Sequence, residues 1–176
     1  MVINQKEIQT NEDTHLEISL SDLIFEGNQL VDSVILAGGD NYTFTDLKVT
    51  PTNDFNGVLN INATAKKGAL VSEVFSIKVT VNAVNDFPVA QADFENVDKG
   101  SSQNSIDVLA NDSDVDNDTL ALKSFEYTGT GSVGISDNKI IYTPAVDFTG
   151  IELIGYVIDD GNLGIGAGVL TITVVD

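Results

Sequence analysis

The stretch NDSDVDNDT, residues 111–119, places four aspartates in nine positions. Its acidic residues fall on every second position: Asp112, Asp114, Asp116 and Asp118. Carboxylates this close repel one another, so the stretch is either a solvated acidic loop or a loop that surrounds a cation. Alternate aspartates on an extended backbone can direct several oxygens to one ion, and Ca²⁺ takes 6–8 oxygen ligands at about 2.3–2.6 Å. Calcium is the cofactor that this pattern favours.

Further acids stand at loops that we expect near the same end of the fold. Asp93 precedes a predicted strand, and Asp159 and Asp160 precede Gly161. We therefore add these three aspartates to the predicted calcium ligands. The arrangement is not an EF-hand, because the sixth position counted from Asp112 is an asparagine, the twelfth is a lysine, and the flanks are strands.

Other chemistries find little support in the residue types. His15 is the only histidine and there is no cysteine, which argues against zinc and against a histidine-activated nucleophile. The glycine-rich stretch GNLGIGAG, residues 161–168, is a predicted hairpin and does not match a nucleotide-binding loop. A pair of carboxylates of the glycosidase kind stays open, although small sandwiches offer little cleft and tryptophan is absent. We expect no enzymatic activity.

The charge balance limits the possible partners. The chain of 176 residues has 27 Asp and Glu against 8 Lys and Arg, a formal net charge of −19. Nucleic acid and anionic membrane surfaces would be repelled, and no apolar run approaches the roughly 20 residues of a membrane span. The start MVINQKEIQT has no apolar segment of the signal-peptide kind, so we expect a secreted protein to carry this chain as part of a longer one. We expect a monomer with no nucleic-acid partner and no membrane insertion.

The chain contains an internal repeat. VTPTNDFNG, residues 49–57, returns as YTPAVDFTG, residues 142–150, at an offset of 93 residues. The same offset aligns Ile77, Val79 and Val81 with Leu170, Ile172 and Val174, whereas upstream it falls to 90 and aligns Asp22 with Asp112. Two homologous repeats therefore lie in tandem, which we place at residues 1–86 and 87–176.

Both repeats have the pattern of β-strands. HLEISL, FSIKVTVNAV, KIIYTP, ELIGYVI and VLTITVV alternate apolar and polar residues at period two, and Gly, Asn and Asp separate them. No sustained helical periodicity accompanies them. Short strands at regular spacing within about 90 residues favour an all-β fold of two tandem antiparallel Greek-key β-sandwiches.

Three longer motifs together resemble a known family. VLANDSDVDNDTL, YTPAVDFTGIELIGYVIDDGNLG and VNAVNDFPVA are similar to the tandem cadherin-like or bacterial immunoglobulin-like repeats of large secreted bacterial adhesins, including RTX adhesins. The resemblance covers both repeats and is closer in the second. It implies a place on the bacterial cell surface, stiffening by calcium, and a role as an extender in adhesion and biofilm formation. Neighbouring repeats of the same long chain are the partners it implies. The alternative is a module that binds a surface glycan or a protein ligand, with calcium as a possible bridge.

The resemblance also points to calcium at the junction. Asn85 and Asp86 resemble the linker that cadherin-like repeats use to share calcium, and Pro88 adds stiffness. Glu12 and Asp13, in TNEDT, resemble the acidic motif that pairs with a preceding linker. These four acidic and amide residues complete the predicted metal ligands.

The first repeat departs from the calcium pattern. Ile24 and Asn28 stand where the second repeat has Asp114 and Asp118, and Lys66–Lys67 stand opposite the pair of aspartates at 159 and 160. We expect the corresponding calcium site of the first repeat to be lost.

Overall fold

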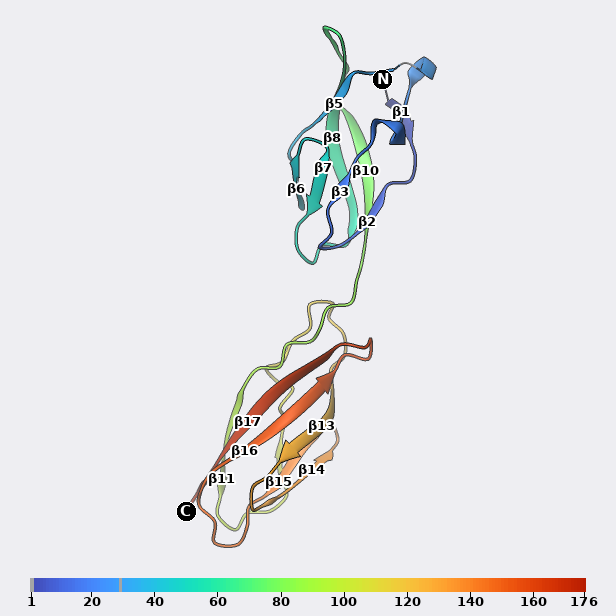
Figure 1. Cartoon of the computed structure of the whole chain (residues 1–176). Coiled ribbons are helices and arrows are strands. Elements are labelled where there is room, and N and C mark those ends of the chain that lie inside the picture. Colours follow the sequence, from blue (N-terminus) through green and yellow to red (C-terminus); the bar gives the residue numbers. More distant parts are fainter. Residues whose placement is uncertain (1, 29) are drawn as a thin grey trace. The chain divides into compact units, whose positions relative to one another are not determined.

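The structure is a computed structural model that describes residues 2–28 and 30–176. The chain divides into two compact units, Met1–Val84 and Asn85–Asp176, which are called unit one and unit two (Figure 1). The division falls two residues before the boundary expected from the sequence. Asn85 and Asp86 belong to unit two because their amide and backbone N–H groups bond to Asp160 and Asp116 of that unit.

The described residues of unit one form mostly short strands, two longer strands and two short 3₁₀ segments, the second of which is kinked at Gly27. Its main sheet has the order β2-β10-β8-β5, with β9 on the outer side of β8, and two smaller sheets have the orders β3-β7-β6 and β1-β4. The strands are β1 (Val2–Gln5), β2 (Gln9–Asn11), β3 (Leu16–Glu17), β4 (Leu23–Phe25), β5 (Ser33–Leu36), β6 (Tyr42–Thr45), β7 (Lys48–Pro51), β8 (Gly57–Lys67), β9 (Leu70–Val71) and β10 (Phe75–Asn82), and the helices are η1 (Leu20–Asp22) and η2 (Glu26–Asn28).

Unit two has fewer and longer strands. One sheet has the order β11-β17-β16-β13 and the other has the order β12-β15-β14. The strands are β11 (Asp93–Asp98), β12 (Asn104–Ile106), β13 (Ala121–Tyr127), β14 (Ser132–Ser136), β15 (Lys139–Thr143), β16 (Gly150–Asp159) and β17 (Ile165–Val175).

Alternation of side chains between the faces of each strand builds the two cores. On β8 and β10 of unit one, every second residue is buried, from Leu59 to Ala65 and from Ile77 to Val81. On β16 and β17 of unit two, Ile154, Ile158 and Leu170 are fully buried in the same way. A half-buried strand buries aliphatic side chains at period two. This is why the alternation in the sequence predicts the strands.

The prediction of an all-β fold is confirmed, with one addition in each unit. The final strand of each unit, β10 or β17, also pairs in parallel with an early strand of that unit, β2 or β11. All other strand pairs within the described residues are antiparallel. In the described part of the chain, no helix has the length and apolar character that a membrane span requires.

Candidate calcium site

The predicted calcium loop connects β12 to β13, and its own backbone shapes it. Oδ1 of Asp114 accepts hydrogen bonds from the backbone N–H groups of Asp116, at 2.9 Å, and Asp118, at 3.3 Å. Asn117 has a φ of 62°, which asparagine tolerates better than most residues. This turn brings carboxylate oxygens of Asp114, Asp116 and Asp118 within 4.8 Å of one another.

Two neighbouring groups orient the carboxylates of Asp116 and Asp118. Oδ2 of Asp116 accepts from the backbone N–H of Asp86 at 2.8 Å, and Oδ2 of Asp118 accepts from the Asn162 amide at 2.8 Å. Each of the three aspartates of the loop is therefore held by a donor, and each retains oxygen lone pairs for a further ligand. Asn162 was not predicted as a partner of the loop, because it lies 44 positions away from Asp118 in the chain.

Two oxygens of the loop are buried without compensation. Among the described residues, neither Oδ2 of Asp112 nor Oδ2 of Asp114 has a hydrogen-bond partner, although both atoms are shielded from solvent. The lysines of unit two do not supply the missing charge, because they pair with acids outside the loop: Lys99 with Asp176, Lys123 with Asp159, and Lys139 with Asp107. Burial of a carboxylate oxygen without a donor or a counter-charge is costly. A hard cation with oxygen ligands fits this donor set.

Asp93 and Asp112 form a second acidic pair, around the hydroxyl of Tyr156. That hydroxyl lies 2.7 Å from Oδ2 of Asp93 and 3.4 Å from Oδ1 of Asp112, and it also lies 2.7 Å from the backbone oxygen of Gln91. One hydroxyl proton cannot satisfy all three acceptors. Burial raises the pKa of both carboxyl groups, and the charge of Asp112 adds to the rise at Asp93.

Tyr156 was missed by the reasoning from sequence, although a signal was present. It occupies an inward position in the alternating pattern of ELIGYVI, and a buried tyrosine hydroxyl usually finds a polar partner.

Asp159 and Asp160 have different partners despite being adjacent. Asp159 is the last residue of β16, whereas Asp160 lies in the connection that follows, so the two carboxylates find different partners. Asp159 forms an ion pair with Lys123, which lowers the pKa of Asp159. Asp160 is buried and closes the turn before β17, because its oxygens accept from the N–H groups of Asn162, at 2.6 Å, and Gly164, at 3.0 Å, and from the Asn85 amide at 2.8 Å. The Asn85 hydrogen bond is the main cause that lowers the pKa of Asp160.

The predicted acidic residues near the start of unit one make contacts within that unit. Glu12 is only 3% exposed, and its Oε1 accepts from the backbone N–H of Val84 at 2.5 Å. Asp13 accepts from the backbone N–H of Asp54 at 3.3 Å. Their coordination of calcium, like that by Asn85 and Asp86, stays a prediction.

The segment of unit one that aligns with the calcium loop has a different structure. Oδ2 of Asp22 accepts from the backbone N–H of Ser19 at 3.0 Å and caps η1. In the described residues, neither Asp22 nor Glu26 belongs to a group of acids close enough to share one ion. Lys66 is partly exposed and Lys67 is exposed at the end of β8.

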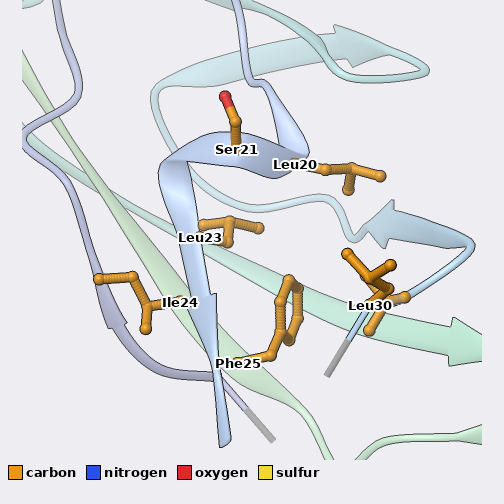
Figure 2. Close-up of a pocket in the computed structure, with 7 residues that line it drawn as sticks. Leu20, Ser21, Leu23, Ile24, Phe25 and Leu30 are labelled. Carbon is orange, nitrogen blue, oxygen red and sulfur yellow. The ribbon is translucent and has the colours of Figure 1, made fainter. Parts of the chain in front are cut away.

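An apolar hollow of about 510 Å³ lies at this segment of unit one (Figure 2). Its lining residues are Leu20, Ser21, Leu23, Ile24, Phe25, Leu30 and Val31. Figure 2 shows the side chains of Leu23 and Phe25 on β4 and that of Leu20 on η1 around it. None of these residues offers a carboxylate, so the lining of the hollow has no charge with which to bind a cation.

Comparison with known families agrees with this fold and with the repeat. The model of the bacterial Ig domain family matches residues 85–173, slightly more than half of the chain. The chain belongs to the bacterial Ig domain family. The match covers the unit that contains the predicted calcium loop, and the resemblance to bacterial Ig-like repeats inferred from the sequence is confirmed. A search of curated proteins found no match.

Solved structures of cadherin repeats share the fold. The chain is similar to repeats EC1-2 of human mucin-like protocadherin, with a TM-score of 0.57 and 16% identity over 98% of this chain and 96% of that one. It is also similar to EC22-24 of mouse cadherin-23, with a TM-score of 0.57 and 15% identity over 98% of this chain and 63% of that one. Identities this low show a shared fold alone. An endo-fucoidan hydrolase of glycoside hydrolase family 107 aligns with a TM-score of 0.40 and 12% identity, which carries no argument about activity.

Proposed function

We propose that the chain is a calcium-binding, extracellular repeat module of a bacterial surface adhesin that serves as a calcium-stiffened extender in adhesion and biofilm formation. The observation that carries this proposal is the group of Asp114, Asp116 and Asp118, whose oxygens converge while Oδ2 of Asp114 is buried without a partner. Calcium would supply the positive charge that this group lacks.

The chain's own residues prepare the site. Asp114 holds the loop in a turn, and the donors from Asp86 and Asn162 fix the directions of the other two carboxylates. Because the loop is already folded by these bonds, little further ordering is needed when an ion binds, and affinity benefits from such preorganisation.

A structural role agrees better with the molecule than catalysis does. Membership of the bacterial Ig domain family and the tandem arrangement of two units favour a spacer whose partners are neighbouring repeats. The single histidine, His15, is exposed just before β3. The net charge of −19 disfavours nucleic acid and anionic membranes as partners.

Calorimetric titration of the full chain with Ca²⁺ tests the proposal. We expect binding to the wild type and at least a tenfold weaker affinity for the double variant Asp114→Asn/Asp118→Asn, because two of the three charges of the group are removed. Asp137→Asn is the matched control, since it removes an exposed aspartate in the turn between β14 and β15 and its φ of 51° suits asparagine. The absence of binding to the wild type, or equal affinity in the double variant and the control, would contradict the proposal.

A further inference from the structure

The outer face of the main sheet of unit two carries exposed apolar side chains. Phe94 on β11 is 77% exposed, Ile151 and Leu153 on β16 are 66% and 58% exposed, and Val169 on β17 is 45% exposed. These four residues are called the apolar face. Side chains on this side of β16 alternate with buried ones such as Ile154, so the apolar face points away from the core.

The strand register makes the apolar face continuous. Thr171 lies between Phe94 and Leu153, because it pairs with Phe94 of β11 on one side and with Leu153 of β16 on the other. Ile151 pairs with Thr173, one position along the same face, and Val169 pairs with Gly155, which leaves its side chain uncovered. Neighbouring strands lie about 4.8 Å apart, so these side chains form one surface.

The fold itself does not require apolar residues here, as unit one shows. At the offset of 93 residues, Leu153 and Thr171 correspond to Asn60 and Lys78, and these two residues pair with each other on β8 and β10 of unit one. Val169 corresponds to Ser76. The positions of Leu153 and Val169 are thus polar in the homologous sheet of unit one, so these two apolar side chains of unit two need another reason.

A second copy of the chain is a poor occupant for this surface. The apolar face exposes roughly 400 Å², given that one phenylalanine offers about 150–250 Å². A symmetric pair would bury roughly 800 Å², below the roughly 1,200–2,000 Å² of stable interfaces. Residues 85–176 also contain 3 lysines against 16 aspartates and glutamates, so the formal charge is 3 − 16 = −13 and two copies repel each other.

The edge of the apolar face is acidic. Glu126 on β13 is exposed and pairs with Gly155, and Asp98 on β11 is exposed on the same side as Phe94. Lys123 on β13 is already paired with Asp159, and Lys99, next to Asp98, is paired with Asp176. An apolar centre with acidic sides is complementary to a protein surface that has an apolar strip flanked by lysine or arginine.

We propose that the outer face of the β11-β17-β16-β13 sheet is a docking surface for a basic, amphipathic segment of a partner protein. Phe94, Ile151 and Leu153 supply the apolar contact, and Glu126 and Asp98 supply the charge. The inference does not depend on calcium, because none of these five residues is a proposed ligand.

The test uses the ¹⁵N-labelled full chain and a short peptide of alternating leucine and lysine as the probe. We expect saturable binding with shifts of the amide resonances of β16 and β17. The double variant Leu153→Asn/Val169→Ser should weaken binding at least tenfold, and it introduces the residues that unit one already accommodates at these positions, so the sheet should stay folded. Val58→Asn is the matched control, because Val58 of unit one is 53% exposed at the position that corresponds to Ile151. This control should bind the peptide as the wild type does.

Three results would overturn the proposal. One is equal binding of the peptide to the wild type and the double variant, which would show attraction to acidic charge in general. Another is binding of a peptide of alternating leucine and glutamate as strong as that of the leucine–lysine peptide, which would show that charge does not select the partner. The third is a dimer in sedimentation experiments that the double variant dissociates, which would assign the face to a second copy of the chain.

Discussion

Glu152 is the most completely satisfied buried acid of unit two. It is 6% exposed and accepts hydrogen bonds from the hydroxyl groups of Tyr127 and Tyr142 and from both the N–H and the hydroxyl of Thr130. Burial alone would raise the pKa of Glu152, but the hydrogen bonds from Tyr127 and Tyr142 outweigh it and lower the pKa to about 2. Burial beside this carboxylate raises the pKa of Tyr127 to about 12. Glu152 therefore joins β16 to the loop after β13.

Replacement of this carboxylate should destabilise unit two in a pH-dependent way. We expect Glu152→Gln to lower the free energy of unfolding by about 2 kcal/mol at pH 7, since hydrogen bonds to charged groups contribute about 1.5–3 kcal/mol each. The folded-state pKa lies below the ordinary value of 4.5, so the stabilisation is present above pH 4.5 and is lost as the pH falls toward about 2.

Urea unfolding of wild type and variant between pH 7 and pH 2 measures this difference. It should be constant above about pH 5 and should shrink below it. Glu126→Gln, on the exposed side of β13, should change stability by less than about 0.5 kcal/mol. A difference between Glu152→Gln and wild type that grows on acidification would contradict the assignment.

At the scale of elements, the hairpin of β16 and β17 positions the Tyr156 hydroxyl between Asp93 and Asp112. Tyr156 on β16 pairs with Gly168 on β17, and a Cβ atom at position 168 would collide with the tyrosine ring. The glycine leaves the space through which the Tyr156 hydroxyl reaches Asp93 and Asp112. The turn between the strands uses a second glycine, Gly161, at a φ of +81°.

Gly168→Ala should therefore displace Tyr156 and cost about 1–3 kcal/mol, the usual range for overpacking. Gly134→Ala on β14 is the control, because a Cβ there meets nothing within 4 Å and its φ is not in the left-handed region. Thermal unfolding of both variants checks the prediction. A melting temperature of Gly168→Ala equal to that of Gly134→Ala would show that the ring moves aside without cost.

At the scale of the whole molecule, the two units have separate cores and different acidic loops. Calcium should stabilise isolated unit two by about 2.7 kcal/mol at a hundredfold excess over Kd, which corresponds to a rise in melting temperature of roughly 10–20 °C. Isolated unit one should respond less, because Asp22 caps η1 and Ile24 replaces a ligand. Scanning calorimetry of residues 1–84 and 85–176, with calcium and with EGTA, compares them. An equal or larger shift for unit one would show that its loop retains a site.

The proposed role as a spacer depends on the stiffness of the junction. If Asn85 and Asp86 share calcium between the repeats, small-angle scattering of the full chain should give a narrow distance distribution in calcium and a broader one in EGTA. Asp86→Ala should broaden the distribution in calcium as well. Identical curves in calcium and EGTA would attribute any stiffness to Pro88 and to packing, and would confine calcium to the loop of unit two.

The sequence by itself determined the features that depend on local order along the chain. Period-two alternation in VLTITVV and ELIGYVI predicted strands, and the repeated TP and FxG motifs predicted two homologous units, because strand faces and turn residues are encoded within a few positions. The spacing of Asp114, Asp116 and Asp118 also predicted their convergence, since a short loop keeps near neighbours together.

The tertiary structure alone decided which distant groups meet. Asp159 and Asp160 are adjacent in sequence, yet one pairs with Lys123 and the other holds Asn85, because β16 ends at Asp159 and Asp160 lies in the connection to β17. Tyr156 reaches Asp93 across 63 positions, and Glu152 gathers its donors from the loop after β13. The apolar face likewise depends on the pairing of β11, β17 and β16, because only strand register places Phe94 and Leu153 on either side of Thr171. These contacts depend on long-range pairing and burial, which the local pattern of residues does not predict.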